Sequence, residues 1–267
     1  VGTPIGNLSD ISARALNILK NVSFIACEDT RQTIKIMNKY AIKNNLISFN
    51  KYNTSIKTPK IINDLKSEKS IALVSDAGMP GICDPGEELV KNAKHFGFDV
   101  VCIPGPCAAI TALVSSGLPS SKFIFEGFLP KKKSDREKII FEISKNTKTT
   151  IIYESPHRIK KLLKELKHFC GGSRKLELAR ELTKKFEEHI GQDIDSVIDF
   201  YDGKDPKGEF TLLLKGIEFS KNINLDTIQI KQDLNDLVDI GLSLSVASKY
   251  LAKKNNISKS VIYNLYK

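Results

Sequence analysis

The chain has 267 residues, of which 41% are hydrophobic and 27% are charged, so its composition is typical of a soluble globular protein with one large or two modest domains. No apolar run approaches the roughly 20 residues of a membrane-spanning helix, and no basic-then-apolar export signal opens the chain at Val1. The formal net charge of +10 favours polyanionic partners but fits plain solubility equally well.

The cysteines argue against both a zinc site and a disulfide framework. They are odd in number and scattered, and no CxxC or Cys/His spacing suits a metal. We therefore expect reduced thiols, no metal, no membrane association and a cytoplasmic location, with an opening strand that has lost a few native residues. The five are Cys27, Cys83, Cys102, Cys107 and Cys170.

The first half of the chain alternates apolar strands with amphipathic helices. This pattern is typical of an α/β domain with a largely parallel sheet covered on both faces. Gly117 and Pro119 end its last helix, which places a domain over residues 1–118. Strands are expected at 24–28, 46–50, 70–75 and 99–104, and helices at 11–21, 31–40, 57–66, 87–96 and 107–116.

The second half predicts a mixed sheet with helices over 119–220 and a small helical domain over 221–267. Ser134 and Glu137 have the spacing of a capping box for the first helix there. The last two helices fit either a helix-turn-helix or a hairpin packed on the body of the protein. Strands are expected at 123–128, 149–154, 175–181, 187–191 and 209–215, and helices at 135–144, 156–169, 194–201, 226–239, 245–254 and 259–266.

Three loops rich in Gly and Pro follow strands of the first domain. The longest, 74–86, links an apolar strand to a helix and exceeds the about two to five residues that a plain connection needs. Loops 2–8 and 104–109 resemble it. Because loops at the carboxyl ends of parallel strands meet at one edge of the sheet, we expect a shared ligand cleft there. No phosphate-cradle motif is present, which disfavours nucleoside triphosphates and dinucleotides.

Four charged segments are candidates for binding or catalysis. In Glu28–Arg31 an arginine opposes the dipole of its own helix, which fits phosphate binding or simple capping. Arg158, near the start of another helix, either faces the cleft or pairs with Glu154. The run 131–133 either grips phosphates or is simply solvated, and the charged run 180–188, between two strands, fits a solvated turn.

Together these segments resemble the tetrapyrrole-methylase-like (class III) methyltransferases that use S-adenosylmethionine. Within that superfamily the chain is similar to the group that 2′-O-methylates a cytidine ribose in the decoding region of small-subunit (16S) ribosomal RNA. Met79, Cys83 and Cys107 depart from the group, which carries small hydroxyl residues there. The matching stretches are GTPIGNLSDIS from Gly2, EDTR from Glu28, VSDAGMPGICDPG from Val74, PGPCAA from Pro104, EGFLPKK from Glu126, YESPHR from Tyr153, ELTKKFEE from Glu181 and KGE from Lys207.

The resemblance implies a fold, a cofactor and a set of site residues. The fold is the two-domain tetrapyrrole-methylase one, with the extra helical tail, and the protein is a homodimer acting on small-subunit rRNA or the 30S subunit. S-adenosylmethionine lies folded between the two domains. Its expected contacts are Pro4, Asp76, Gly78, Met79, Ile82, Cys107, Ala108, Glu154, Arg180 and Phe210.

Catalysis by such a protein needs alignment, exclusion of water and removal of the hydroxyl proton. We expect Glu154 or Glu181 to accept or orient that proton, and Arg31, Arg158 and Lys184 to hold the flanking phosphates. Further RNA contacts are expected from Lys131, Lys132, Lys133 and His157. Two alternatives stay open: carbon methylation of a tetrapyrrole by the same fold, and an RNA-binding protein without enzymatic activity.

Overall fold

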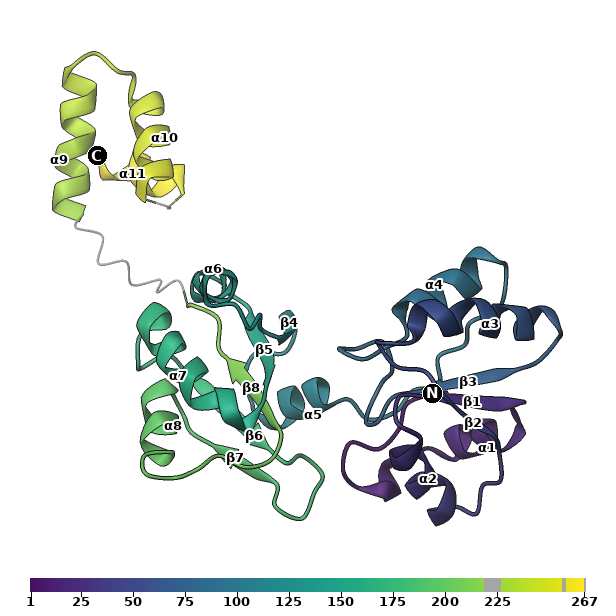
Figure 1. Cartoon of the computed structure of the whole chain (residues 1–267). Helices are drawn as coiled ribbons and strands as arrows, with labels where there is room; N and C mark the ends of the chain where they lie inside the picture. The colour runs from purple at the N-terminus through teal and green to yellow at the C-terminus, as the bar shows by residue number, and fades with distance from the viewer. Residues whose placement is uncertain (219–226, 256–257, 267) are drawn as a thin grey trace. The chain divides into compact units, whose positions relative to one another are not determined.

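The computed structural model describes residues 1–218, 227–255 and 258–266 (Figure 1). Its contacts divide the chain into two compact units, Val1–Ile217 and Glu218–Lys267. Within the described residues no helix is long and apolar enough to cross a membrane.

The first sheet of the larger unit is parallel and has the strand order β2-β1-β3. Its strands are β1 (Phe24–Cys27), β2 (Leu46–Ser48) and β3 (Ile71–Val74). Alternate side chains of β1 enter two cores: Ile25 packs with residues of α1 (Ala13–Asn21) and α2 (Thr30–Lys39), and Phe24 packs with α3 (Thr54–Lys66) and α4 (Glu87–His95). The expected α/β sheet with helices on both faces is confirmed.

The strand expected at 99–104 does not form among the described residues. The segment has no regular secondary structure, and the carbonyl of Ile103 accepts a hydrogen bond of 2.9 Å from the N–H of Gly2. Pro104 and Pro106 carry no amide hydrogen, so a ladder cannot continue past this point. The opening segment is likewise tied by single contacts, chiefly the bridge between Thr3 and Gly78.

The second sheet is mixed, as expected, with the order β4-β5-β8-β6-β7. β4 (Phe123–Phe128) and β5 (Thr149–Glu154) are parallel, and β8 (Phe210–Leu214) lies antiparallel to both β5 and β6 (Leu176–Arg180). β7 (Glu188–Ile190) forms the edge.

Helices cover both faces of this sheet. The three helices α6 (Lys133–Ser144), α7 (Pro156–Cys170) and α8 (Ile194–Phe200) bury a large core on one face (Figure 1). α5 (Ala108–Ser115) packs on the other face. The loop 104–107 of the first half leads directly into α5, so this helix joins the part of the unit that holds the first sheet to the second sheet.

The capping box predicted for Ser134 and Glu137 is wrong. Helix α6 begins at Lys133 with Lys132 as its N-cap and no side-chain cap. The hydroxyl of Ser134 contacts Asp135 instead, at 3.3 Å. Ser134 is the second residue of this helix and therefore cannot be its N-cap.

The smaller unit contains α9 (Thr227–Asp239), α10 (Leu244–Asn255) and α11 (Lys259–Leu265). It has a core of its own, with Leu234, Ala247, Leu251 and Ile262 buried. The helix start expected at Asp226, and residues 256 and 257 of the expected turn, lie outside the described residues.

Candidate active site

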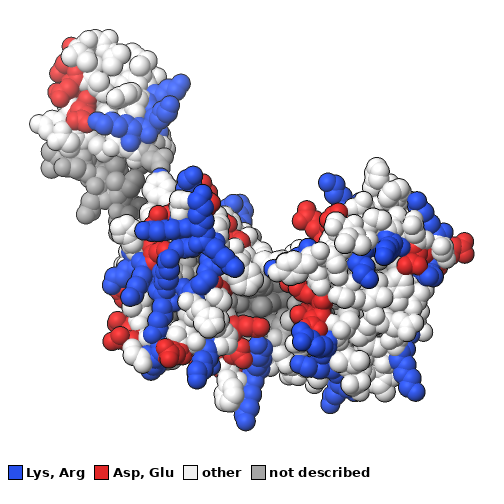
Figure 2. Space-filling model, viewed as in Figure 1, with Lys and Arg blue, Asp and Glu red and all other residues white. Residues whose placement is uncertain are grey.

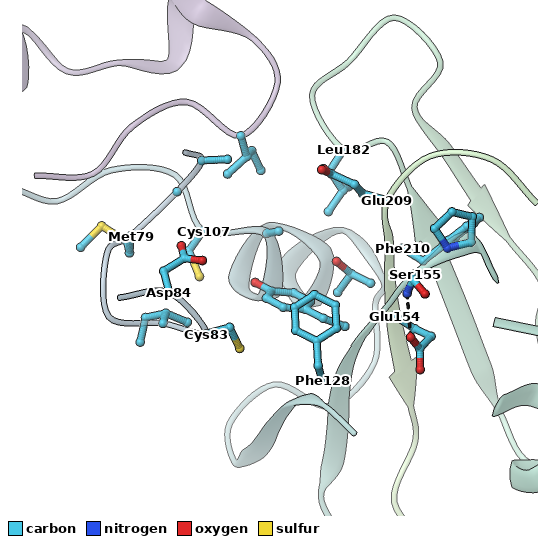
Figure 3. A pocket seen from close by; sticks show the side chains of 18 residues that line it. Met79, Cys83, Asp84, Cys107, Phe128, Glu154, Ser155, Leu182, Glu209 and Phe210 are labelled. Atoms are coloured by element: carbon cyan, nitrogen blue, oxygen red, sulfur yellow. Dashed lines mark hydrogen bonds between the residues drawn. The ribbon is translucent and has the colours of Figure 1, made fainter. Parts of the chain in front are cut away.

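A cavity of about 310 Å³ lies where the loop after β3 faces the ends of β5 and β8 (Figure 3). This volume is at the lower end of the range for small-molecule sites. In Figure 3 the loop side chains stand opposite those of the second sheet, so both halves of the larger unit form its wall. The lining residues are Ile5, Ala77, Gly78, Met79, Ile82, Cys83, Asp84, Cys107, Ala108, Phe128, Tyr153, Glu154, Ser155, Pro156, Leu182, Glu209, Phe210 and Thr211.

The three Gly/Pro loops do meet at this cavity. Thr3 and Gly78 exchange backbone hydrogen bonds of 2.8 and 3.1 Å. A Cβ on Gly2 would stand 2.7 Å from the Cα of Gly105, so the two backbones touch in a way that only glycine permits. The convergence therefore depends on the glycines in particular.

Tyr153 holds α5 against the second sheet at the edge of the cavity. Its hydroxyl oxygen accepts a hydrogen bond of 2.9 Å from the N–H of Ala109. Its ring packs against Phe125 and Phe128, with centroids 5.0 and 5.6 Å away. Burial raises the pKa of this phenol, so it stays protonated. The first turn of α5 is thereby fixed beside the cavity.

Glu154 places a buried carboxylate on the cavity wall. The residue is 2% exposed. Its Oε1 accepts a hydrogen bond of 2.7 Å from the N–H of Ser155 (Figure 3). Its Oε2 lies 3.4 Å from the Arg158 guanidinium, but it accepts no hydrogen bond. Buried polar atoms are nearly always hydrogen-bonded, so Oε2 is an unmet acceptor in the wall of the cavity.

Asp84 is a second carboxyl on the wall, and the sequence analysis missed it. Burial raises its pKa, opposed by a hydrogen bond with Ser75. The signal was present, because Asp84 is an acid inside the loop that the sequence singled out. Its neighbour Cys83 has a φ of +63°, a strained conformation of the kind that clusters at ligand sites.

The expected cofactor residues fall into three groups. Pro4 and Asp76 line an adjoining pocket instead of the main cavity. Arg180 lines neither; it donates to the carbonyl of Lys207 and to Glu188, at 2.6 and 2.7 Å. The main cavity collects Gly78, Met79, Ile82, Cys107, Ala108, Glu154 and Phe210.

The expected general-base candidates are separated by the structure. Glu181 is not on the cavity wall: its Oε1 accepts from Lys184 and from the N–H of Glu209, both at 2.9 Å. Although burial opposes it, these hydrogen bonds lower the pKa of Glu181. Lys184 also bonds the Glu209 carboxylate at 2.8 Å and faces the adjoining pocket.

The expected RNA-contacting residues differ in how many contacts their side chains make within the protein. Arg31 is 87% exposed in its side chain and pairs with Asp29 at 2.6 Å. Arg158 donates to the carbonyls of Leu129 and Pro130, at 2.9 and 3.3 Å, and so anchors the loop before α6. The other four expected RNA contacts are exposed residues: Lys131, Lys132, Lys133 and His157.

Positive charge gathers on the surface of the larger unit around the second sheet (Figure 2). Figure 2 shows lysine and arginine side chains over the helices that cover the second sheet. Lys132 and Lys133 pair with acids of α6 only at 3.6 Å, so these contacts are weak. Among the described residues, no cluster of three or more His, Cys, Asp or Glu side chains is arranged to hold a metal.

Residues 1–197 match the family described as tetrapyrrole (corrin/porphyrin) methylases. The chain belongs to this family. Ribosomal RNA small subunit methyltransferase I of Bacillus subtilis is 41% identical over 273 residues, with 100% of this chain and 92% of the relative covered. The Vibrio cholerae protein of the same name is 42% identical over 265 residues, covering 98% and 91%. Within the tetrapyrrole methylases, the chain groups with these proteins.

A third relative is shorter. Ribosomal RNA small subunit methyltransferase I of Thermotoga maritima is 43% identical over 218 residues, which are 82% of this chain but 97% of the relative. The remainder of this chain, close to the smaller unit in length, has no counterpart there.

Solved structures of tetrapyrrole methylases and related enzymes share the fold. A cobalt precorrin-4 methyltransferase superposes with a TM-score of 0.61 at 14% identity, covering 80% of this chain and 92% of that chain. Diphthine synthase superposes with a TM-score of 0.61 at 13% identity, covering 80% and 88%. These likenesses confirm the fold class.

Proposed function

We propose that this protein uses S-adenosylmethionine to methylate the 2′ oxygen of a cytidine ribose in the decoding region of small-subunit rRNA. The observation that carries the proposal is the near-full-length similarity to proteins named ribosomal RNA small subunit methyltransferase I. The choice of the 2′ oxygen and of a cytidine rests on the resemblance of the loop motifs to the group of rRNA 2′-O-methyltransferases. A homodimer stays a prediction.

The cavity suits S-adenosylmethionine by its chemistry. Its walls are mostly apolar, as a purine ring requires, and they carry the carboxyl groups of Asp84 and Glu154. A molecule with a sulfonium and an ammonium group is matched in charge by these acids. Bound there, the cofactor supplies an activated methyl group, so no metal is needed.

Of the two candidate bases, the geometry favours Glu154. Glu154 lines the cavity and has one carboxylate oxygen without a hydrogen bond, whereas the Glu181 carboxylate is engaged by Lys184. Glu154 Oε2 accepts or orients the ribose hydroxyl proton. The guanidinium of Arg158 lies 3.4 Å away, holds this carboxylate in place and also fixes the loop that bears Lys131.

The exposed basic side chains supply the RNA contacts. Lys131, Lys132 and Lys133 neutralise phosphates on one side of the cavity, with His157 beside them. Arg31 and Lys184 do so from the adjoining side, exchanging their present acidic partners for phosphate. Positioning the ribose in this way accounts for much of the rate acceleration.

A substrate comparison tests the class of reaction. We expect label from methyl-labelled S-adenosylmethionine to enter isolated 30S subunits or their rRNA, and not a tetrapyrrole precursor. Label in the tetrapyrrole alone would overturn the proposal. Cofactor binding without any transfer to RNA would also count against it.

A variant pair tests the assignment of the base. Glu154→Gln should lower kcat by about 10²–10⁴-fold, the usual contribution of general-base catalysis. Glu181→Gln should have a much smaller effect on kcat, because Glu181 is outside the cavity. Comparable losses in kcat for both variants would contradict the assignment.

A further inference from the structure

The smaller unit has separated positive and negative surfaces. Helix α9 carries Asp233, Asp236 and Asp239, with Lys231 as its one basic residue. The described residues from 240 to 266 include four lysines and no acidic side chain. Figure 2 shows this unit with acidic side chains on one side and basic ones on the other.

The outward face of α10 combines lysine and tyrosine at helical spacing. Val246, Lys249, Tyr250 and Lys253 stand at i, i+3, i+4 and i+7, so they share one face. All four are exposed, and Tyr250 retains 58% of its accessible surface. The residues that alternate with them, including Ala247 and Leu251, are buried in the core of the unit. The unit therefore folds without using this face.

The next helix repeats the pattern. Lys259, Tyr263 and Tyr266 stand at i, i+4 and i+7 along α11 and its C-cap. Tyr263 is 40% exposed and Tyr266 is 41% exposed. The Lys259 ammonium donates to the hydroxyl of Ser245 at 2.8 Å, which joins the start of α11 to the start of α10.

This combination fits one class of partner. Lysines without acidic neighbours attract phosphates, and exposed tyrosine rings stack on unpaired bases with little regard to sequence. Among the described residues neither Lys249 nor Lys253 makes an ion pair. The lysines and the exposed tyrosines together therefore match a polyanion that also carries flat aromatic rings.

We propose that the outward faces of α10 and α11 bind single-stranded RNA and so help to dock the substrate. This inference rests on the proposed function, because small-subunit rRNA is the RNA in question. The shorter Thermotoga maritima relative carries the same name without a segment of this length. The smaller unit accordingly adds affinity for RNA, while methyl transfer resides in the larger unit.

The test uses the full-length chain and a labelled single-stranded oligoribonucleotide, with binding followed by fluorescence anisotropy at several salt concentrations. The first variant is Lys249→Gln/Lys253→Gln/Lys259→Gln. The charge-matched control is Lys20→Gln/Lys60→Gln/Lys94→Gln, on exposed positions of the first-sheet helices. A second variant, Tyr250→Ala/Tyr263→Ala, removes rings without changing charge.

The variant with three lysines of the smaller unit replaced should weaken binding at least tenfold more than the control. Each phosphate contact on a single strand contributes about 0.7 to the salt slope, so the loss of three contacts should reduce the slope by about 2. The tyrosine variant should weaken binding about tenfold or more with an unchanged slope. Equal effects of the tail and control lysine variants would overturn the proposal. So would a tyrosine variant that binds like the wild type, or tyrosine effects as large on duplex RNA as on the single strand.

Methyl transfer separates this inference from the proposed function. In 30S methylation, the tail variants should raise KM several-fold and leave kcat unchanged. RNA binding is measured without cofactor, so absence of methyl transfer by the wild type refutes the proposed function alone. Normal methyl transfer with unaltered RNA binding in the tail variants refutes the docking role alone.

Discussion

Removing the Arg136 side chain should destabilise the larger unit severely. Arg136 is 3% exposed. Its guanidinium makes two hydrogen bonds of 2.7 Å to Glu165 and two more, of 3.1 and 2.8 Å, to the carbonyls of Pro130 and Lys131. Arg136→Ala leaves a carboxylate and two carbonyls without these partners. Breaking a buried pair in this way costs about 3–5 kcal/mol, or a fall in Tm of about 10 °C at this chain length.

The assay is urea unfolding followed by circular dichroism for Arg136→Ala, Glu165→Ala and the double variant. The two residues contact each other, so the double variant should fall short of the summed losses by about 2 kcal/mol. Removing both charges spares the cost of leaving one buried alone. Losses that add within about 0.5 kcal/mol, or an Arg136→Ala loss below about 1 kcal/mol, would refute this reasoning.

Two further predictions concern the backbone of the site and the pH dependence of stability. Gly105→Ala should abolish cofactor binding by calorimetry, because the new Cβ would stand 2.8 Å from the Cα of Gly2; binding within twofold of the wild type would contradict this. His189 contacts Glu177 at 2.7 Å, and its pKa is raised by its acidic partners although burial opposes the shift. Its stabilising contribution is therefore full below the unfolded pKa of about 6.5 and is lost as pH rises through the higher folded value. The free-energy difference between wild type and His189→Gln should shrink from pH 5.5 to 8.5, and a constant difference would be inconsistent with this pairing.

The fold was largely predictable because local patterns and tertiary contacts agree. The strands at 123–128 and 149–154 match the structure residue for residue. The strand prediction at 99–104 failed because the apolar composition of the segment is typical of a strand, while Pro104 at its end and Pro106 beyond it cannot donate to a ladder. The capping box at Ser134 failed because the helix begins at Lys133, one residue before Ser134, and Arg136 bonds back to the carbonyls of Pro130 and Lys131.

The candidate site was predictable in outline but not in its detail. The glycine-rich loops indicated a cleft, and the structure brings them together. Sequence could not show that Glu154 lines the cavity and Glu181 does not, since both glutamates lie at the ends of strands of similar pattern. It also did not identify Tyr153, whose role depends on a single hydrogen bond to α5.

The position of the transferred methyl group tests the central claim most directly. Small-subunit rRNA lacking its natural methyl groups would be incubated with the protein and isotopically labelled S-adenosylmethionine, digested to nucleosides and examined by mass spectrometry. We predict that the label appears as 2′-O-methylcytidine from the decoding region, and that Glu154→Gln reduces it by at least about 100-fold. Label on a base, on another ribose, or undiminished in that variant would contradict the account.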